Sequence, residues 1–143
     1  MALFAAFAII TGLGLLAFAR LAPSDPAVWH AEPDLVAVVG QGPWNSVVAS
    51  STGATLRLPS EKAASLLLQL DRLAMATPRT YRLAGNPEQG RITWITRSPL
   101  WGFPDYITAQ VQPDGLYIYA RLRFGLNDLG VNAARLNDWL TKL

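Results

Sequence analysis

The sequence predicts an α+β fold, in which two helices cover one face of an antiparallel sheet that follows an apolar N-terminal helix. Three observations lead to this prediction: an uncharged start over residues 1–19, two segments with apolar residues at helical spacing, and apolar–polar alternation after Pro78. We expect a two-layer fold, an antiparallel β-meander of four to six strands packed by two helices and preceded by one transmembrane helix.

The composition narrows the class of protein. The chain has 143 residues, enough for one domain with a modest core. It is 51% hydrophobic and only 15% charged, whereas roughly a quarter of a soluble domain is charged, so part of the chain is expected to avoid water in another way. The net charge of +2 and the scattered arginines lack the basic stripe of a nucleic-acid-binding protein. With no cysteine and with His30 as the only histidine, no metal site or cofactor is predicted.

Residues 1–19, MALFAAFAIITGLGLLAFA, are predicted to form a transmembrane anchor. At about 1.5 Å per residue, this segment just crosses a hydrocarbon core about 30 Å thick. A cleaved signal peptide is the alternative, since Ala17 and Ala19 have the small-x-small form of a cleavage site. We favour the uncleaved anchor, because a basic n-region is missing and the apolar run exceeds the usual length of about 7 to 15 residues. Taken alone, Arg20 would place the following domain in the cytoplasm by the positive-inside rule.

Residues 20–34 are predicted to be a Pro-rich stalk. Pro23, Pro26 and Pro33 each block a continuous helix and favour an extended chain. Trp29 suits either the membrane interface or packing on the domain, and His30 is expected to be structural.

The remaining residues, 35–143, are expected to form the α+β domain. Its first helix follows Ser60, which can cap it, and ends before Pro78; its second helix follows Asp128 and closes the chain. In both helices, apolar residues recur every three or four positions and form one core-facing stripe. The stripes are Ala63, Leu66, Leu67, Leu70, Leu73 and Ala74 in the first helix, and Leu129, Ala133, Leu136, Leu140 and Leu143 in the second.

Four strands are predicted between these helices. TYRLA and RITWITR flank the turn-rich GNPEQG, and DYITAQV and LYIYARLRF flank QPDG. Farther upstream, NSVVASS and ATLRL can add one or two strands. A two-residue loop at QPDG would pair Tyr106 with Arg121, whereas a G1 bulge would shift the pairing by one residue and bury the tyrosines. The sequence leaves both registers open.

Polar residues gather where the last strand leads into the last helix, and we treat this polar junction as the candidate site. Arg121 and Arg123 share the non-core face of the strand, and Asp128 is placed to cap the helix. A two-residue loop would also bring Asp105 close to Arg123. The junction is either a hydrogen-bonded structural lock, which we favour, or a site for an anionic ligand. Its residues are Asp105, Arg121, Arg123, Asn127, Asp128, Asn132 and Arg135.

An apolar loop precedes this junction. The segment SPLWGFPDY places Trp101, Phe103 and Tyr106 near the polar residues, and an apolar loop beside convergent polar groups is a common layout of a binding site. Alternatively, the aromatic rings fold back onto the sheet as part of the core. We treat the three side chains as candidate apolar contacts.

Motifs near the C-terminus resemble those of a known family. The residues Phe103, Pro104, Asp105 and Tyr106, then Arg121, Arg123 and Gly125, then DLGVN from Asp128 to Asn132 and Arg135, resemble the C-terminal signature of the domain of unknown function 1499 family. The resemblance covers the last hairpin and helix, and more loosely the chain from Leu35 onward. It implies an extracytoplasmic domain behind a membrane segment in a bacterial protein, with no established activity. Leu122 stands where the family often has serine, and GPWNSVVASS lacks the frequent cysteine, so no role of those side chains is carried over.

These patterns favour a binding or interaction module and leave enzymatic activity undecided. GxSxG, HExxH and P-loop motifs are missing, and His30 in a stalk cannot complete a serine triad. The alternative is a hydrolase-like enzyme that uses the carboxylates and arginines on an anionic substrate. We expect a single-pass protein of the bacterial inner membrane with a periplasmic domain. The expected partners are the membrane and either an envelope protein or an anionic ligand.

Overall fold

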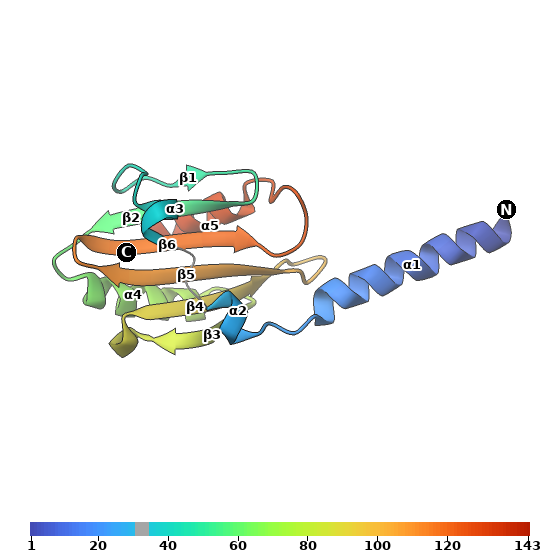
Figure 1. Cartoon of the computed structure of the whole chain (residues 1–143), viewed down its shortest axis with the longest axis horizontal. Coiled ribbons are helices and arrows are strands. Elements are labelled where there is room, and N and C mark those ends of the chain that lie inside the picture. The colour runs from blue at the N-terminus through green and yellow to red at the C-terminus, as the bar shows by residue number, and fades with distance from the viewer. Residues whose placement is uncertain (31–34) are drawn as a thin grey trace.

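A computed structural model describes residues 1–30 and 35–143 of the chain (Figure 1). One long N-terminal helix leads into a domain built on a single sheet. In chain order, the elements are α1 (Ala2–Leu21), α2 (Pro26–Trp29), α3 (Leu35–Val39), β1 (Val48–Ala49), β2 (Gly53–Pro59), α4 (Ala63–Ala76), β3 (Thr80–Asn86), the 3-10 turn η1 (Pro87–Gln89), β4 (Arg91–Arg97), β5 (Pro104–Gln112), β6 (Gly115–Leu122) and α5 (Val131–Leu140).

The sheet has six strands in the order β1-β2-β6-β5-β4-β3. Strands β3 to β6 form the predicted meander. Strand β2, which precedes the meander in the chain, pairs antiparallel with the other side of β6. The hairpin between β5 and β6 has a two-residue loop, because Gln112 pairs with Gly115 and Tyr106 pairs with Arg121. The α+β class, the antiparallel sheet and the preceding apolar helix confirm the predicted fold.

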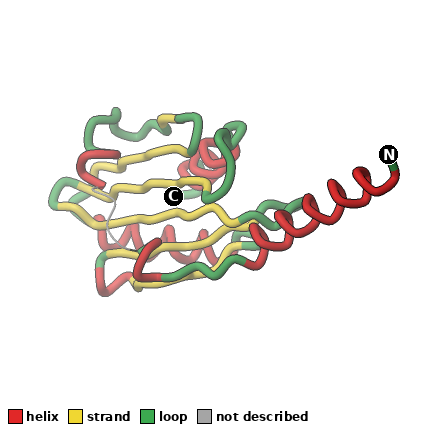
Figure 2. The backbone as a smooth tube through the Cα atoms, turned by 45° about the vertical axis from the view of Figure 1, so that its right-hand side comes forward, coloured by secondary structure: helices red, strands yellow, loops and turns green. Residues whose placement is uncertain are grey.

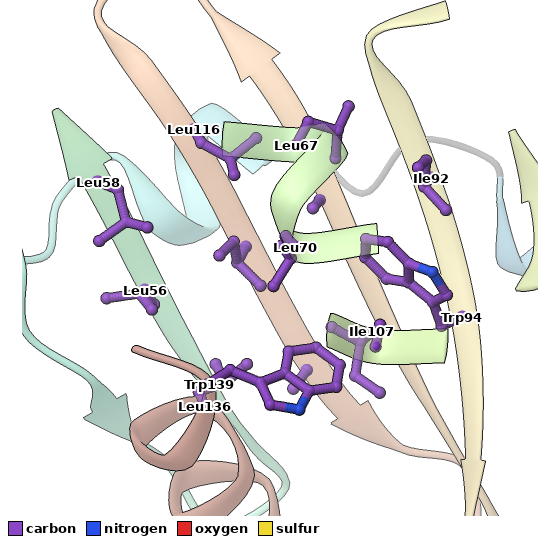
Figure 3. Close-up of a cluster of buried hydrophobic side chains, with 14 of the residues drawn as sticks. Leu56, Leu58, Leu67, Leu70, Ile92, Trp94, Ile107, Leu116, Leu136 and Trp139 are labelled. Atoms are coloured by element: carbon purple, nitrogen blue, oxygen red, sulfur yellow. The ribbon is translucent and has the colours of Figure 1, made fainter. Parts of the chain in front are cut away.

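Helices α4 and α5 cover one face of the sheet and enclose the main core (Figures 1 and 3). Leu67, Leu70 and Leu136 are fully buried against the apolar side chains of the strands. Trp94 and Trp139 meet edge to face, with ring centroids 6.2 Å apart. Burial of each such side chain contributes on the order of 1.5–3 kcal/mol. This face of the sheet therefore depends on apolar packing for its stability.

The two buried tryptophans keep their indole N–H groups paired. Trp94 Nε1 donates to Oδ1 of Asp71 over 3.0 Å, and Trp139 Nε1 donates to Oγ1 of Thr77 over 3.0 Å. Asp71 is itself buried in α4 and forms an ion pair with Arg82 of β3. These polar contacts avoid the cost of unsatisfied donors inside the core.

The linker between α1 and the sheet, residues 22–30, lies across the opposite face (Figure 1). The ring of Trp29 stacks on that of Tyr106, with centroids 3.9 Å apart and planes inclined by 4°. His30 Nδ1 lies 2.9 Å from Oγ1 of Thr93. The segment expected to be a stalk is thus bound to the sheet over its described part, since the strands beneath it offer rings and hydroxyls as partners. Residues 31–34, including Pro33, lie outside the described residues.

Helix α1 projects from one end of the sheet and leaves its apolar surface exposed (Figures 1 and 2). Within the part of the chain that the structure describes, it holds the one span, Leu3–Leu21, that is long and apolar enough to cross a membrane. Such a span is either an anchor or a signal sequence. At its base, Phe18 packs edge to face on Phe124, with ring centroids 6.1 Å apart. Arg97 Nη1 also donates to the carbonyl oxygen of Arg20 over 2.9 Å.

The start of the last helix differs from the prediction. Helix α5 begins at Val131, because Leu129 and Gly130 have left-handed φ values of 54° and 76°. Leu129 was predicted to belong to the core-facing stripe, but it is 87% exposed and lies outside the core, whereas Leu136 is fully buried as predicted. The turn redirects the chain before the helix forms, and periodicity alone does not reveal such a turn.

Candidate functional site

The predicted polar junction divides between the two faces of the sheet. Neighbouring strand residues point to opposite faces, and Asp105 pairs with Leu122 while Tyr106 pairs with Arg121. Arg121 therefore lies on the linker face, whereas Asp105 lies on the helix face. The expected contact between Asp105 and Arg123 is wrong. Instead, Oδ2 of Asp105 lies 3.6 Å from Nη1 of Arg135 in α5.

On the linker face, the arginines join α1 and the linker to the sheet. Arg123 Nη1 donates to the carbonyl oxygens of Ala22 and Pro23, over 3.2 and 3.0 Å, and to Oη of Tyr106 over 3.0 Å. Arg121 donates to the carbonyl oxygen of Trp29 over 2.9 Å. We call Trp29, Tyr106, Arg121 and Arg123 the linker cluster. Because carbonyl oxygens of residues 22–29 accept these hydrogen bonds, Arg121 and Arg123 hold the linker on the sheet.

Burial shifts the pKa of two titratable groups, Arg121 within the linker cluster and His30 beside it. It lowers the pKa of Arg121, whose guanidinium Nη1 also donates to Oγ1 of Thr108 over 3.2 Å. It likewise lowers the pKa of His30, and the nearby charge of Arg91 adds to the effect. Both effects favour the neutral form of His30, whose ring nitrogen contacts Thr93 of the sheet.

On the helix face, Asn127 and Asp128 shape the turn before α5. Oδ1 of Asp128 accepts the N–H of Gly130 over 2.9 Å, and its Oδ2 accepts the N–H of Asn132 over 3.1 Å. Oδ1 of Asn127 accepts the N–H of Leu129 over 2.7 Å. Asp128 thus serves the first turn of α5, as predicted, although it lies two residues before the N-cap position, Gly130.

Asp105 differs from Asp128 in its hydrogen bonds. The oxygens of Asp128 accept backbone N–H groups, whereas those of Asp105 do not. Burial raises the pKa of the Asp105 carboxyl, and the charge of Asp128 raises it further. These effects outweigh the lowering of the pKa by Arg135 and Asn132. Its contact with Arg135 is longer than a hydrogen bond. Arg135 donates instead to Oδ1 of Asn132 over 2.5 Å. The side chains of Arg135 and Asn132 thus face the Asp105 carboxylate, and its remaining lone pairs can accept hydrogen bonds from a ligand.

A surface cleft of about 190 Å³ opens beside these carboxylates. We call it the carboxylate cleft; its lining residues include Ser98, Trp101, Phe103, Asp105, Asp128 and Leu129. Trp101 is 49% exposed at the rim, and Phe103 packs edge to face on Phe124 with ring centroids 6.2 Å apart. Tyr106, the third candidate contact, lies instead on the linker face under Trp29. The cleft thus combines two carboxylates with an apolar rim.

The cleft suits a ligand that donates hydrogen bonds and does not suit an anion. Arg121 and Arg123, the cations expected to attract an anion, lie across the sheet, and Arg135 is turned toward Asn132. No group of three or more His, Cys, Asp or Glu side chains able to hold a metal occurs among the described residues. The chemistry of the site therefore comes from Asp105 and the surrounding aromatic side chains.

Sequence reasoning missed Leu129 and Phe124 as cleft residues. Leu129 matched the helical stripe, yet the Gly130 that follows it is a signal for a left-handed turn before the helix. Phe124 was included in the predicted strand LYIYARLRF, although it lies beyond the end of β6 and contacts both Phe18 and Phe103.

The fold and the cleft define an α+β sheet domain that follows an apolar N-terminal helix and carries a small carboxylate-lined hollow where that helix joins. Residues 23–143 match the family described as Protein of unknown function (DUF1499). The chain belongs to this family, which confirms the resemblance of its C-terminal motifs. The match includes the linker, which packs on the sheet. No curated protein and no solved structure gave a significant match.

Proposed function

We propose that the protein is a single-pass protein of the bacterial inner membrane whose periplasmic domain binds an envelope protein through the carboxylate cleft. The observation that carries the binding role is Asp105. Its half-buried carboxylate lies in the cleft wall with unused acceptor capacity, next to the exposed ring of Trp101. A buried acceptor beside an apolar rim gives both affinity and orientation to a partner.

Retention of α1 as an anchor is supported by how its last turn contacts the domain. A signal peptidase acting after Ala19 would need access to a residue that is only 7% exposed. The carbonyl oxygens of Arg20 and Ala22, which follow the cut, accept hydrogen bonds from Arg97 and Arg123. We therefore expect the mature protein to keep residues 1–19.

Topology and processing are tested on the full chain. A reporter that is active only outside the cytoplasm, fused after Leu143, should be active, and the intact mass should include residues 1–19. An inactive reporter would contradict the periplasmic domain and favour the orientation that Arg20 alone indicates. A mass lacking the segment would contradict the anchor.

The cleft is tested by photo-crosslinking in native membranes. A benzophenone amino acid at Leu129, at the cleft rim, should yield one discrete protein adduct, whereas the same group at the exposed Val36 of α3 should not. Asp105→Asn should reduce the adduct about tenfold, because a hydrogen bond to a charged acceptor contributes roughly 1.5–3 kcal/mol. The control Asp138→Asn, on the exposed side of α5, should have no effect. Equal adducts at both positions would contradict the proposal.

A hydrolase-like enzyme acting on an anionic substrate is the second candidate. The raised pKa of Asp105, a property of general acids, favours it, whereas the position of Arg121 and Arg123 on the other face of the sheet disfavours an anion in this cleft. Ser98 supplies a hydroxyl in the cleft lining, but its Oγ accepts the N–H of Phe103 over 3.0 Å. His30, the histidine that would activate it, is bound to Thr93 on the linker face. The arrangement of these groups thus supports binding better than hydrolysis.

A further inference from the structure

A second hollow, which we call the arginine cavity, opens at the end of the sheet where α1 joins the domain. Its volume is about 310 Å³, and its lining includes Arg20, Arg79 and Arg97 from three separate segments. Arg20 ends the apolar helix, Arg79 precedes β3 and Arg97 ends β4. Ser98 lines both this cavity and the carboxylate cleft, so the two hollows are neighbours.

None of the three arginines forms an ion pair with a carboxylate of the described residues. In the described part of the chain, Arg82 pairs with Asp71, Arg135 with Asp105 and Lys142 with Asp138. Arg97 donates to the carbonyl oxygens of Arg20 and Gly102 and, over 3.3 Å, to Oη of Tyr81. These neutral acceptors orient its guanidinium but leave its charge uncompensated.

The other two guanidinium groups have unused donors. Arg79 donates only through Nε, to the carbonyl oxygen of Arg97 over 3.2 Å, and its Nη atoms form no hydrogen bond with the described residues. The side chain of Arg20 passes over Gly102, where a Cβ would lie 3.1 Å from its Nε. Gly102 has a φ of +70° and lacks a side chain, so it makes room for Arg20 at the cavity wall.

The position of the cavity indicates what kind of anion reaches it. The Leu3–Leu21 span of 19 residues is about 28 Å long at 1.5 Å per residue, close to the hydrocarbon thickness of a bilayer. When this span crosses a membrane, Arg20 lies at the level of the lipid headgroups. The adjoining loop exposes Leu100 and Trp101, at 74% and 49%, and such residues favour the boundary between headgroups and acyl chains.

We propose that the arginine cavity binds the phosphate of an anionic phospholipid headgroup. Guanidinium groups bind phosphate oxygens through paired, charge-assisted hydrogen bonds, and three unpaired cations around one hollow are stabilised by such an anion. The binding site rests on the proposed anchor, since α1 sets its depth. It is independent of the partner of the carboxylate cleft.

Native mass spectrometry of the full chain in detergent tests this proposal. Phosphatidylglycerol should remain bound at several-fold higher occupancy than phosphatidylcholine, whose choline group is repelled by the arginines. The double variant Arg20→Gln/Arg79→Gln should lose at least about tenfold in phosphatidylglycerol affinity, because two charge-assisted contacts are removed. The two arginine side chains make few contacts within the domain, so the variant should keep the fold. Lys62→Gln, which removes an exposed charge at the start of α4, far from the cavity lining, should bind as the wild type does.

Three outcomes would overturn the assignment. Equal occupancy of the two lipids would exclude selection by the cavity, and unchanged binding by the double variant would exclude these arginines. Displacement of the lipid by inorganic phosphate, at matched ionic strength, with the same dependence on Arg20 and Arg79, would assign the cavity to free phosphate. The intact mass from the same spectra shows whether residues 1–19 are present, so a failed anchor is distinguished from a failed lipid site.

Discussion

The two faces of the sheet are covered in different ways. On the helix face, α4 and α5 bury leucine and tryptophan side chains in one continuous apolar core. On the linker face, residues 22–30 are held by a stacked ring pair, arginine donors and hydroxyls, and beside them Leu35 and Val39 of α3 form a smaller apolar cluster with Tyr117. Apolar packing is cooperative across a whole layer, whereas hydrogen-bonded attachment can loosen locally. We therefore expect damage to the first face to unfold the domain and damage to the second to release the linker.

The largest effect is expected from Trp139→Ala in α5. The ring is 1% exposed and packs on Trp94, so its removal should lower the free energy of unfolding by about 3–5 kcal/mol. Val131→Ala, at a position 48% exposed in the same helix, should cost far less. Urea denaturation followed by circular dichroism measures both values. Similar losses in the two variants would show that α5 is not a core element.

A smaller and local effect is expected from Trp29→Ala. This change removes the stack on Tyr106, which contributes about 0.5–1.5 kcal/mol beyond the area that it buries. Hydrogen exchange should accelerate in residues 22–30 while the strands stay protected. Val28→Ala, at a position 61% exposed, is the matched control and should leave exchange unchanged. If the strands lose protection together with the linker, the two faces form one cooperative unit and the proposed difference fails.

Asp128→Ala tests the polar turn at the edge of the cleft. Loss of both acceptors for the N–H groups of Gly130 and Asn132 should lower the free energy of unfolding by about 1–2 kcal/mol. Asp138→Ala breaks only an exposed pair with Lys142 and should cost about 0.5 kcal/mol or less. Thermal or urea unfolding compares the two. A greater loss from the exposed aspartate would contradict the capping role of Asp128.

The smallest effect concerns the protonation of Asp105. Because burial raises the pKa of its carboxyl, the folded state binds this proton more tightly than the unfolded state does. The contribution of Asp105 to stability is thus greatest below its ordinary pKa and falls as pH rises through the raised value. Carbon-detected NMR titration should give a pKa above 3.8 for Asp105. Arg135→Gln should raise it further, and a wild-type pKa at or below 3.8 would refute the assignment.

The sequence was sufficient to predict which residues are buried where the periodicity of a single strand or helix decides their burial. Alternation along β6 separated Leu116, Ile118 and Ala120 from Tyr117 and Tyr119, and the structure buries the first three in the helix-covered core. Helical spacing likewise identified Leu67, Leu70 and Leu136 as core residues. Both rules concern neighbours within one element, so they need no knowledge of the rest of the chain.

The sequence was insufficient where distant segments meet. Placing Asp105 relative to Arg123 required the face of each strand residue as well as the hairpin register, and the predicted junction combined side chains from opposite faces. The stacking of Trp29 on Tyr106 joins residues 77 positions apart (106 − 29), and the prolines between α1 and the sheet indicated only an extended chain. The arginine cavity was missed for the same reason, because Arg20, Arg79 and Arg97 converge only after folding.

If α1 is the proposed membrane anchor, the attachment of the chain on both sides of Pro23 limits how far the domain can move from the bilayer. A flexible linker of nine residues, the length of residues 22–30, would have a mean end-to-end distance of about 15–18 Å. Here Arg97 and Arg123 hold the carbonyl oxygens of Arg20, Ala22 and Pro23, so no slack remains between helix and sheet. Tilting α1 would then tilt the whole domain with it. With α1 anchored as proposed, a partner of this domain would have to bind at the lipid surface, and a partner in the same membrane would reach it by lateral diffusion.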